Sequence, residues 1–308
     1  MNIDLPLNSY LKPLKKYLDR KDCVEICINH EHEVVIENTK GEWSFIKDNN
    51  VTRKLFEDLA NYLANKSGQR FDSKMPIFSG RLPNYGYRMQ IMTGAMVESG
   101  LAVCIRVSQA QKLPLNSWMS EEKAKELSDL IVAGNTILIC AGTGCGKTTL
   151  MNSMIEYIPL DKRIVTLQDT QELVVNHRNV VHFIKSKTDT DIAGLEYKHF
   201  MNCITRTRPD RILLGEIDVD NTVAFLNLSS SGHAGSISTI HAENPIEAVN
   251  RLCINAQMSG KTTASVESIR KFALDSVHYF IMLTKTTTKA GRVFKADFIS
   301  TKELINEF

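Results

Sequence analysis

The sequence lacks any CxxC pair among its seven cysteines, which are an odd number. Zinc ribbons and thioredoxin-type redox sites place cysteines in such pairs, so the sequence supports neither class of site. Cys23 and Cys27 are four residues apart in a strand-like segment, but no second cysteine or histidine pair follows at a ligand spacing. We therefore expect buried free thiols rather than a metal site among the cysteines.

Long apolar runs are also missing. The longest, such as 137–140 and 279–283, fall far short of the roughly 18 residues that suggest a membrane-spanning helix. Residues 1–4 carry neither the basic segment nor the apolar stretch of a secretory signal. These features predict a soluble chain of the cytoplasm.

Neither sign of charge is in large excess. Lys and Arg number 37 and Asp and Glu number 35, which gives a formal net charge of +2. A protein that coats nucleic acid or an acidic membrane carries a larger positive excess, so direct nucleic-acid binding is not implied. Hydrophobic residues make up 43% and charged residues 23%, as in ordinary globular proteins, which excludes a disordered or collagen-like chain. At about 150 residues per domain, the 308 residues favour two domains.

The first part of the chain, residues 1–110, is typical of an α+β domain. Residues 51–65 place apolar side chains at helical spacing and predict a helix. Strands are expected where apolar and β-branched residues cluster between turn residues, at 24–28, 34–36, 43–46, 87–92 and 101–107. Residues 111–119, which include Pro114, predict a linker.

Residues 120–308 alternate between helix and strand patterns. Ser120, followed by two glutamates, predicts a helix start. Strands are expected at 136–140, 164–167, 180–184, 211–214, 236–240, 278–283 and 293–299. Helices are expected at 147–157, 197–205, 222–229 and 245–257. This alternation predicts an α/β domain with a largely parallel sheet.

The strongest chemical signal is the segment 141–149, which reads AGTGCGKTT between an expected strand and an expected helix. A phosphate-binding loop requires that setting, because small residues let backbone N–H groups surround phosphate oxygens at a helix N-terminus. Ala141 replaces the usual first glycine with another small residue. We expect a nucleoside triphosphate to bind to Gly142, Thr143, Gly144, Cys145, Gly146, Lys147, Thr148 and Thr149. Lys147 is expected to contact the β- and γ-phosphates, and the Thr148 hydroxyl to ligate Mg²⁺.

A second nucleotide element is the expected strand 211–214, which leads through Gly215 to the carboxylate of Glu216. If this strand lies beside the strand of the phosphate loop, Glu216 lies at the carboxyl edge of the sheet, where such folds bind ligands. Glu216 is then placed to orient or deprotonate the water that attacks the nucleotide.

Three further motifs accompany the phosphate loop. Residues 206–216, RTRPDRILLGE, resemble the RxRPDxxxxGE stretch of the secretion-superfamily ATPases. Residues 231–242 resemble their histidine box, and residues 163–173 resemble their aspartate box. The motifs occur in the order found in that family, over about residues 80–260. The short two-domain chain, without a four-cysteine metal module, most resembles the hexameric traffic ATPase of type IV secretion systems.

This resemblance implies a RecA-like P-loop ATPase domain over 120–308, bound ATP and Mg²⁺, and a homo-hexameric ring. It also implies a peripheral position at the inner face of the inner membrane, beside inner-membrane secretion-channel proteins. By matching position, His241 senses the γ-phosphate and His233 braces the same loop. Arg88 and Arg106 match the two arginines that reach the nucleotide from the amino-terminal domain, a task for which forked guanidinium groups are suited.

Two positions depart from the family pattern. Gln168 stands where the aspartate box usually has Glu, and a glutamine can position a water but cannot take its proton. Asp218 stands where the family usually has Arg, so a cation near the cleft is replaced by an anion. The carboxylates that remain for Mg²⁺ and water are Glu216, Asp169 and Glu172, of which Glu172 is the expected metal ligand beside Thr148.

These residues leave four functions to consider. The favoured one is a hexameric ATPase that powers substrate transfer or apparatus assembly in type IV secretion, and the second is a pilus-retraction or DNA-uptake motor. The third is a nucleotide-gated scaffold with little hydrolysis, which Gln168 and Asp218 favour and Glu216 and His241 oppose. A RecA-like DNA helicase is disfavoured, because the chain is near neutral and has no basic tract interleaved with aromatic residues.

Overall fold

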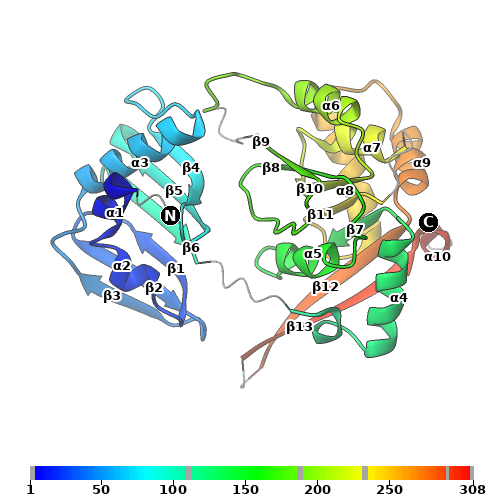
Figure 1. The fold of residues 1–308 in the computed structure, drawn as a ribbon, viewed down its shortest axis with the longest axis horizontal. Coiled ribbons are helices and arrows are strands. Elements are labelled where there is room, and N and C mark those ends of the chain that lie inside the picture. The colour runs from blue at the N-terminus through cyan, green and yellow to red at the C-terminus, as the bar shows by residue number, and fades with distance from the viewer. Residues whose placement is uncertain (1–3, 108–112, 186–189, 231–234, 289–290, 306–308) are drawn as a thin grey trace. The chain divides into compact units, whose positions relative to one another are not determined.

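The computed structural model describes residues 4–107, 113–185, 190–230, 235–288 and 291–305. The chain forms two compact units, and the first consists of Met1–Ala110 together with Lys185–Leu195. The second consists of Gln111–Ile184 and Glu196–Phe308 (Figure 1).

The first unit contains a segment that is distant in sequence. The backbone N–H of Arg70 donates to the carbonyl of Thr190 at 2.7 Å, and the Thr190 hydroxyl donates to Gln69 Oε1 at 3.0 Å. No sequence pattern indicated that a piece of the second half of the chain joins the first unit.

The first unit is built on an antiparallel sheet of six strands in the order β3-β2-β1-β6-β5-β4. The strands are β1 (Cys23–Ile28), β2 (Glu33–Asn38), β3 (Trp43–Lys47), β4 (Ile77–Leu82), β5 (Tyr87–Thr93) and β6 (Leu101–Arg106). The helical elements are α1 (Leu5–Leu11), α2 (Lys15–Leu18), α3 (Arg53–Ser67) and the 3₁₀ turn η1 (Gly94–Met96).

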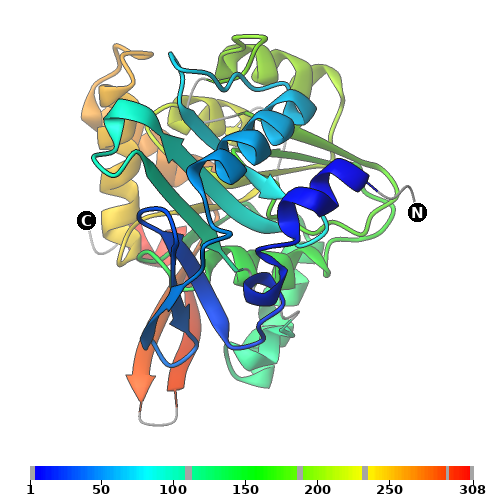
Figure 2. The same cartoon turned by 90° about the vertical axis from the view of Figure 1, so that its left-hand side faces the viewer.

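Helix α3 closes one face of this sheet, as Figure 2 shows. The Thr52 hydroxyl caps its start by accepting the N–H of Leu55, and Gly68 ends it in the left-handed conformation with φ of 66°. Phe56 and Leu59 on α3 are fully buried against the sheet, within a core of apolar residues. Burial of that one apolar face therefore fixes which side of the sheet the helix covers.

The second unit is built on a seven-stranded sheet in the order β13-β12-β7-β11-β10-β8-β9. Its strands are β7 (Ile137–Cys140), β8 (Ile164–Gln168), β9 (Val180–Ile184), β10 (Arg211–Ile217), β11 (Ile237–Ile240), β12 (Tyr279–Thr288) and β13 (Gly291–Ser300). Every neighbouring pair is parallel except β12 and β13, which form an antiparallel hairpin at one edge.

Helices cover both faces of this sheet, so its central strands are buried on both sides. Ile137 and Ile139 of β7 pack toward one core with Leu150, whereas Leu138 and Cys140 pack toward the other. The helical elements are η2 (Leu115–Ser117), α4 (Glu121–Val132), α5 (Lys147–Ile155), α6 (Tyr197–Arg206), α7 (Thr222–Ser230), α8 (Pro245–Met258), α9 (Val266–Ser276) and α10 (Thr301–Leu304).

The expected fold class, an α+β domain followed by an α/β domain with a largely parallel sheet, is confirmed. The sequence patterns missed α1, α2, β4, α9 and α10, together with the short 3₁₀ turns η1 and η2. Helix α1 begins at the cap residue Asp4, and β4 contains Gly80 and Arg81, which weaken its apolar alternation. Among the described residues, no helix is both long enough and apolar enough to cross a membrane.

Candidate nucleotide-binding site

Three adjacent parallel strands bring the expected nucleotide residues to one edge of the second-unit sheet. Strand β7 leads into the phosphate loop, β11 ends directly before His241, and β10 carries Glu216. The expectation that the strand of Glu216 lies beside that of the phosphate loop is wrong, because β11 lies between them. This insertion places His241 between the other two groups.

The phosphate loop joins the buried end of β7 to the start of α5. Gly144 and Gly146 have φ of 69° and 89°, in the left-handed region that glycine adopts without strain. A Cβ atom on Gly146 would lie 3.3 Å from the ring of Trp118, so a side chain there would also be crowded. Glycine at this position lets the chain turn directly into α5, whose first residue is Lys147.

Lys147 holds the loop from inside. Its side-chain Nζ donates to the carbonyls of Ala141 and Gly142 at 3.0 and 3.1 Å, and the residue is only 9% exposed. Burial lowers the pKa of the Lys147 ammonium below its ordinary value, while the nearby Glu216 acts in the opposite direction. The Lys147 ammonium is thus held at the loop by the carbonyl oxygens of Ala141 and Gly142 and by the nearby charge of Glu216.

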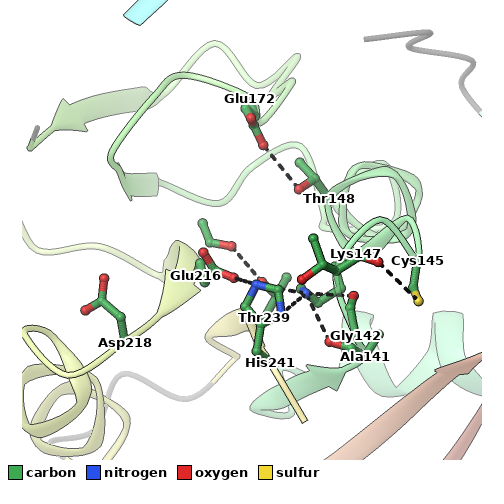
Figure 3. A network of polar contacts seen from close by, with 12 residues as sticks. Ala141, Gly142, Cys145, Lys147, Thr148, Glu172, Glu216, Asp218, Thr239 and His241 are labelled. Carbon is green, nitrogen blue, oxygen red and sulfur yellow. Dashed lines mark hydrogen bonds and ion pairs between the residues drawn. The ribbon is translucent and has the colours of Figure 1, made fainter. Parts of the chain in front are cut away.

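His241 links this cation to a carboxylate, as Figure 3 shows. Its Nδ1 lies 3.1 Å from Lys147 Nζ, and its Nε2 lies 2.6 Å from Glu216 Oε1. An ammonium only donates and an ionised carboxylate only accepts, so we assign the ring proton to Nε2 and leave Nδ1 as the acceptor. The result is a continuous chain of polar contacts from Lys147 through His241 to Glu216.

The two residues expected to hold Mg²⁺ lie together. The hydroxyl of Thr148, in the first turn of α5, donates to Glu172 Oε2 at 3.3 Å. Adjacent oxygen ligands of an octahedral Mg²⁺, each about 2.0–2.1 Å from the ion, are about 3 Å apart. Both donors are hard oxygens at a compatible separation, so this pair fits the metal.

Asn152 also positions Glu172, and the sequence motifs did not indicate it. Its Nδ2 donates to the Glu172 carbonyl at 3.1 Å, and its Oδ1 accepts the N–H of Val174 at 2.9 Å. Asn152 lies one helical turn after Thr148 on α5, and that spacing is the signal from which it could have been found.

Gln168 holds the Glu172 loop by its amide. Its Oε1 accepts the backbone N–H groups of Glu172 and Leu173 at 2.7 and 2.8 Å, and its Nε2 donates to Thr166 Oγ1 at 3.3 Å. The residue is 4% exposed, and a Cβ atom on Gly215 would lie 3.2 Å from it. Through these contacts the Gln168 side chain fixes the conformation of the loop that carries Glu172.

Asp218, the second departure from the family pattern, lies in the turn between the end of β10 and the start of α7. Its Oδ1 accepts the N–H groups of Asp220 and Asn221 at 3.0 and 3.2 Å. Figure 3 shows its carboxylate pointing away from the contact between His241 and Glu216. The acidic side chain thus satisfies backbone donors in the turn that precedes α7.

In the first unit, Arg88 of β5 and Arg106 of β6 stand directly opposite each other in the antiparallel register. Arg81 of β4 continues the same row beside Arg88. Like charges directly opposite one another in a sheet are destabilising, but Glu25 of β1 stands opposite Arg106 on its other side and offsets part of this positive charge. His233, the other histidine of the expected box, lies outside the described residues.

Comparisons with known proteins agree with this fold. The family model described as Type II/IV secretion system protein matches residues 9–274. Protein VirB11 of Rhizobium radiobacter is 31% identical over 287 residues, which cover 82% of this chain and 82% of that protein.

Two solved structures share the fold. The VirB11 ATPase from the Brucella suis type IV secretion system, in complex with sulphate, has a TM-score of 0.51 at 24% identity and covers 99% of this chain and 98% of that one. The pilus retraction motor PilT with bound ADP has a TM-score of 0.67 at 19% identity and covers 98% and 85%. With the family model matched over most of its length, the chain belongs to the Type II/IV secretion system protein family, and VirB11 is among its relatives.

Proposed function

We propose that this protein is an ATPase that powers substrate transfer or apparatus assembly in a type IV secretion system. The observation that carries the proposal is the chain of contacts from Lys147 through His241 to Glu216 at the end of the phosphate loop. It joins a phosphate-binding cation to a carboxylate that can receive a proton. The VirB11 relative at 31% identity supports the assignment to type IV secretion, because the Brucella ATPase of that name belongs to such a system.

In the proposed reaction, the backbone N–H groups of residues 142–149 and the Lys147 ammonium bind the β- and γ-phosphates of ATP. Glu216 orients the attacking water and accepts its proton, a contribution that is typically worth about 10²–10⁴-fold in rate. His241 orients the Glu216 carboxylate through its Nε2–H and reports on the γ-phosphate through its contact with Lys147. Arg88 and Arg106 supply further positive charge to the triphosphate.

Thr148 and Glu172 are the residues that would hold Mg²⁺, which supplies charge neutralisation at the phosphates when bound. Gln168, whose amide bridges the backbone of Glu172 and Leu173, keeps this carboxylate in place rather than exchanging a proton. This division of tasks is compatible with hydrolysis, because Glu216 is the acidic group beside His241.

The working form is a homo-hexamer at the inner face of the inner membrane. Its partners are the inner-membrane secretion-channel proteins, and its contact with the membrane is peripheral. Direct binding of nucleic acid is not implied, in keeping with the net charge of +2.

Phosphate release by the purified chain with Mg²⁺ and ATP tests the enzymatic part. Glu216→Gln should lower kcat by about 10²-fold or more while ATP still binds, because it keeps the shape of the side chain but not its basicity. Glu243→Gln is the matched control, since Glu243 is exposed near the same edge and outside the contact chain. Tight ATP binding with no turnover in the unmodified chain would instead favour the nucleotide-gated scaffold.

An affinity pull-down of the Glu216→Gln chain from its native cells tests the cellular part. Recovery of secretion-channel proteins is expected from an ATP-locked ring. Recovery of pilus platform proteins in their place would assign the chain to a pilus motor. The mass of the purified assembly, measured by light scattering with and without ATP, tests the hexamer.

A further inference from the structure

Two cysteines and a glutamate lie side by side on one face of the first-unit sheet. Cys27 of β1 pairs with Cys104 of β6, and Glu25, two residues before Cys27, pairs with Arg106. Because successive residues of a strand point to opposite faces, Glu25, Cys27 and Cys104 share a face. Ile26, which points the other way, is fully buried in the core beneath the helices. The three polar side chains therefore occupy the face away from that core.

The hydrogen-bond pattern of the sheet brings the two cysteines especially close. The N–H of Val107 donates to the carbonyl of Val24 at 2.9 Å, which makes these residues a hydrogen-bonded pair. Hydrogen-bonded and non-hydrogen-bonded pairs alternate along an antiparallel ladder, and Cys27 with Cys104 is three steps further along. They are a non-hydrogen-bonded pair, the kind in which Cα atoms are only about 4.5 Å apart.

The ligand atoms of the three side chains converge. The Cys104 thiol donates to Glu25 Oε1 at 2.7 Å, and the two Sγ atoms and a carboxylate oxygen all lie within 4.8 Å of one another. Zn–S bonds of about 2.3 Å and Zn–O bonds of about 2.0–2.2 Å place tetrahedral ligand atoms roughly 3.4–3.8 Å apart. Side-chain adjustments of about 1 Å or less would close the three groups around one ion.

The partial burial and the charge of Glu25, Cys27 and Cys104 indicate which class of ligand they would bind. Each of the three residues is half-buried, so its ligand atom is partly shielded from water but still reachable. Glu37 on β2 stands opposite Glu25 on one side, and Arg106 stands opposite it on the other. Two thiolates and a carboxylate bring three negative charges, which a divalent cation offsets. Sulfur ligands favour Zn²⁺ over the oxygen-seeking Mg²⁺ and Ca²⁺.

We propose that Glu25, Cys27 and Cys104 bind one Zn²⁺ ion, with the fourth coordination position left to water or to a ligand from outside the sheet. Each thiol proton passes to solvent as the sulfur binds, so no oxidant or reductant is required. The ion would tie β1 to β6, the two central strands of the sheet. This site is separate in residues and in metal chemistry from Thr148 and Glu172.

The test uses the full chain, reduced, stripped of metal by a chelator, incubated with Zn²⁺ and desalted. Elemental mass spectrometry should then find one Zn²⁺ per chain, and a Cd²⁺ titration should develop the ultraviolet charge-transfer band of cadmium bound by two thiolates. The double variant Cys27→Ser with Cys104→Ser should lose both signals. Cys203→Ser, which removes an exposed thiol on α6, is the matched control and should keep them. Lys147→Ala should also retain the metal, which separates this site from nucleotide binding.

Glu25→Gln keeps both thiols and should weaken Zn²⁺ binding by at least about 10–100-fold, so the proposal stays testable if the double variant fails to fold. Unchanged affinity in Glu25→Gln would remove the carboxylate from the site. Equal zinc content in the unmodified chain and the folded double variant would overturn the proposal. So would a chain that is trapped from cells with a Cys27–Cys104 disulfide and binds no zinc once it is reduced.

Discussion

The Nε2 atom of His241 lies 2.6 Å from the carboxylate Oε1 of Glu216. The same ring reaches Lys147 Nζ through Nδ1 at 3.1 Å, because β11 lies between the strands that carry the other two residues. The His241 ring therefore connects the ammonium of Lys147, which is expected to bind phosphate, to the carboxylate of Glu216, which is the proposed base.

This contact predicts that His241→Ala lowers kcat more than it raises KM. The imidazole orients the Glu216 carboxylate, while other groups hold the phosphates, so a fall of about 10–100-fold in kcat is expected, below the full value of a general base. Steady-state phosphate-release kinetics measure both constants. His30→Ala, an exposed turn residue of the first unit, is the control. A variant that changes KM alone would place His241 in binding rather than in catalysis.

Lys147→Ala should abolish tight nucleotide binding while the fold is kept. Charge-assisted hydrogen bonds contribute about 1.5–3 kcal/mol each, which corresponds to about 10–150-fold in affinity. Binding of a fluorescent ATP analogue, with circular dichroism to verify folding, provides the measurement. Lys125→Ala, on the exposed side of α4, is the matched control. Unchanged affinity in Lys147→Ala would refute the phosphate-loop assignment.

Gln168→Leu should loosen the Glu172 loop, because it leaves the buried N–H group of Leu173 and the part-buried N–H group of Glu172 without their acceptor. Each unsatisfied buried donor costs about 1–3 kcal/mol, so a lower melting temperature and a higher Mg²⁺ requirement for turnover are expected. Gln168→Glu still offers an acceptor oxygen and should keep both properties near those of the unmodified chain, with a modest change in rate. Equal Mg²⁺ dependence in all three chains would rule out this positioning role.

Arg106→Ala should lower the ATPase rate without unfolding the first unit. An arginine that stabilises a transferring phosphoryl group can be worth on the order of 10³-fold, and we expect about 10–100-fold here because Arg88 shares the task. Turnover and first-unit melting should be measured together. Arg53→Ala removes an exposed arginine of the same unit and is the control. Wild-type turnover in a double variant of Arg88 and Arg106 would contradict the role of both.

Asp48 should make the stability of the first unit depend on pH. Burial raises the pKa of its carboxyl, but hydrogen bonds from Lys16, Asn50 and Tyr17 outweigh burial and hold the pKa well below the ordinary value. A carboxyl whose pKa is lower in the folded state stabilises the fold above its unfolded pKa of about 3.9, and this stability is lost as the pH falls through the folded pKa.

Asp48→Asn should therefore destabilise the first unit by about 2 kcal/mol at pH 7, and the difference from the unmodified chain should shrink in acid. Calorimetry between neutral pH and about pH 3 gives the comparison. Asp58→Asn, which removes an exposed helix ion pair with Lys54, should have little effect at any pH. If the stability lost in Asp48→Asn stays constant across this pH range, stability does not depend on the protonation of Asp48 and the prediction is wrong.

Much of the candidate site could be predicted because its pieces are local in the chain. The phosphate loop is one uninterrupted segment whose glycines, lysine and threonines act within a single turn of backbone, and it lies between β7 and α5 as expected. Glu216 could be predicted for the same reason, because it directly follows the apolar residues and Gly215 within the single strand β10. The catalytic and binding roles of these residues remain predictions that the variants above test.

The sequence by itself determined the local elements, because turn residues, apolar spacing and helix caps act between neighbours in the chain. Only the tertiary structure decided that β11 separates β7 from β10, that Gln168 bonds to the Glu172 loop, and that Cys27 faces Cys104. It also decided that Lys185–Leu195 joins the first unit. Strand order and register are set by pairing between segments far apart in sequence, and a one-residue change in register reverses which side chains meet.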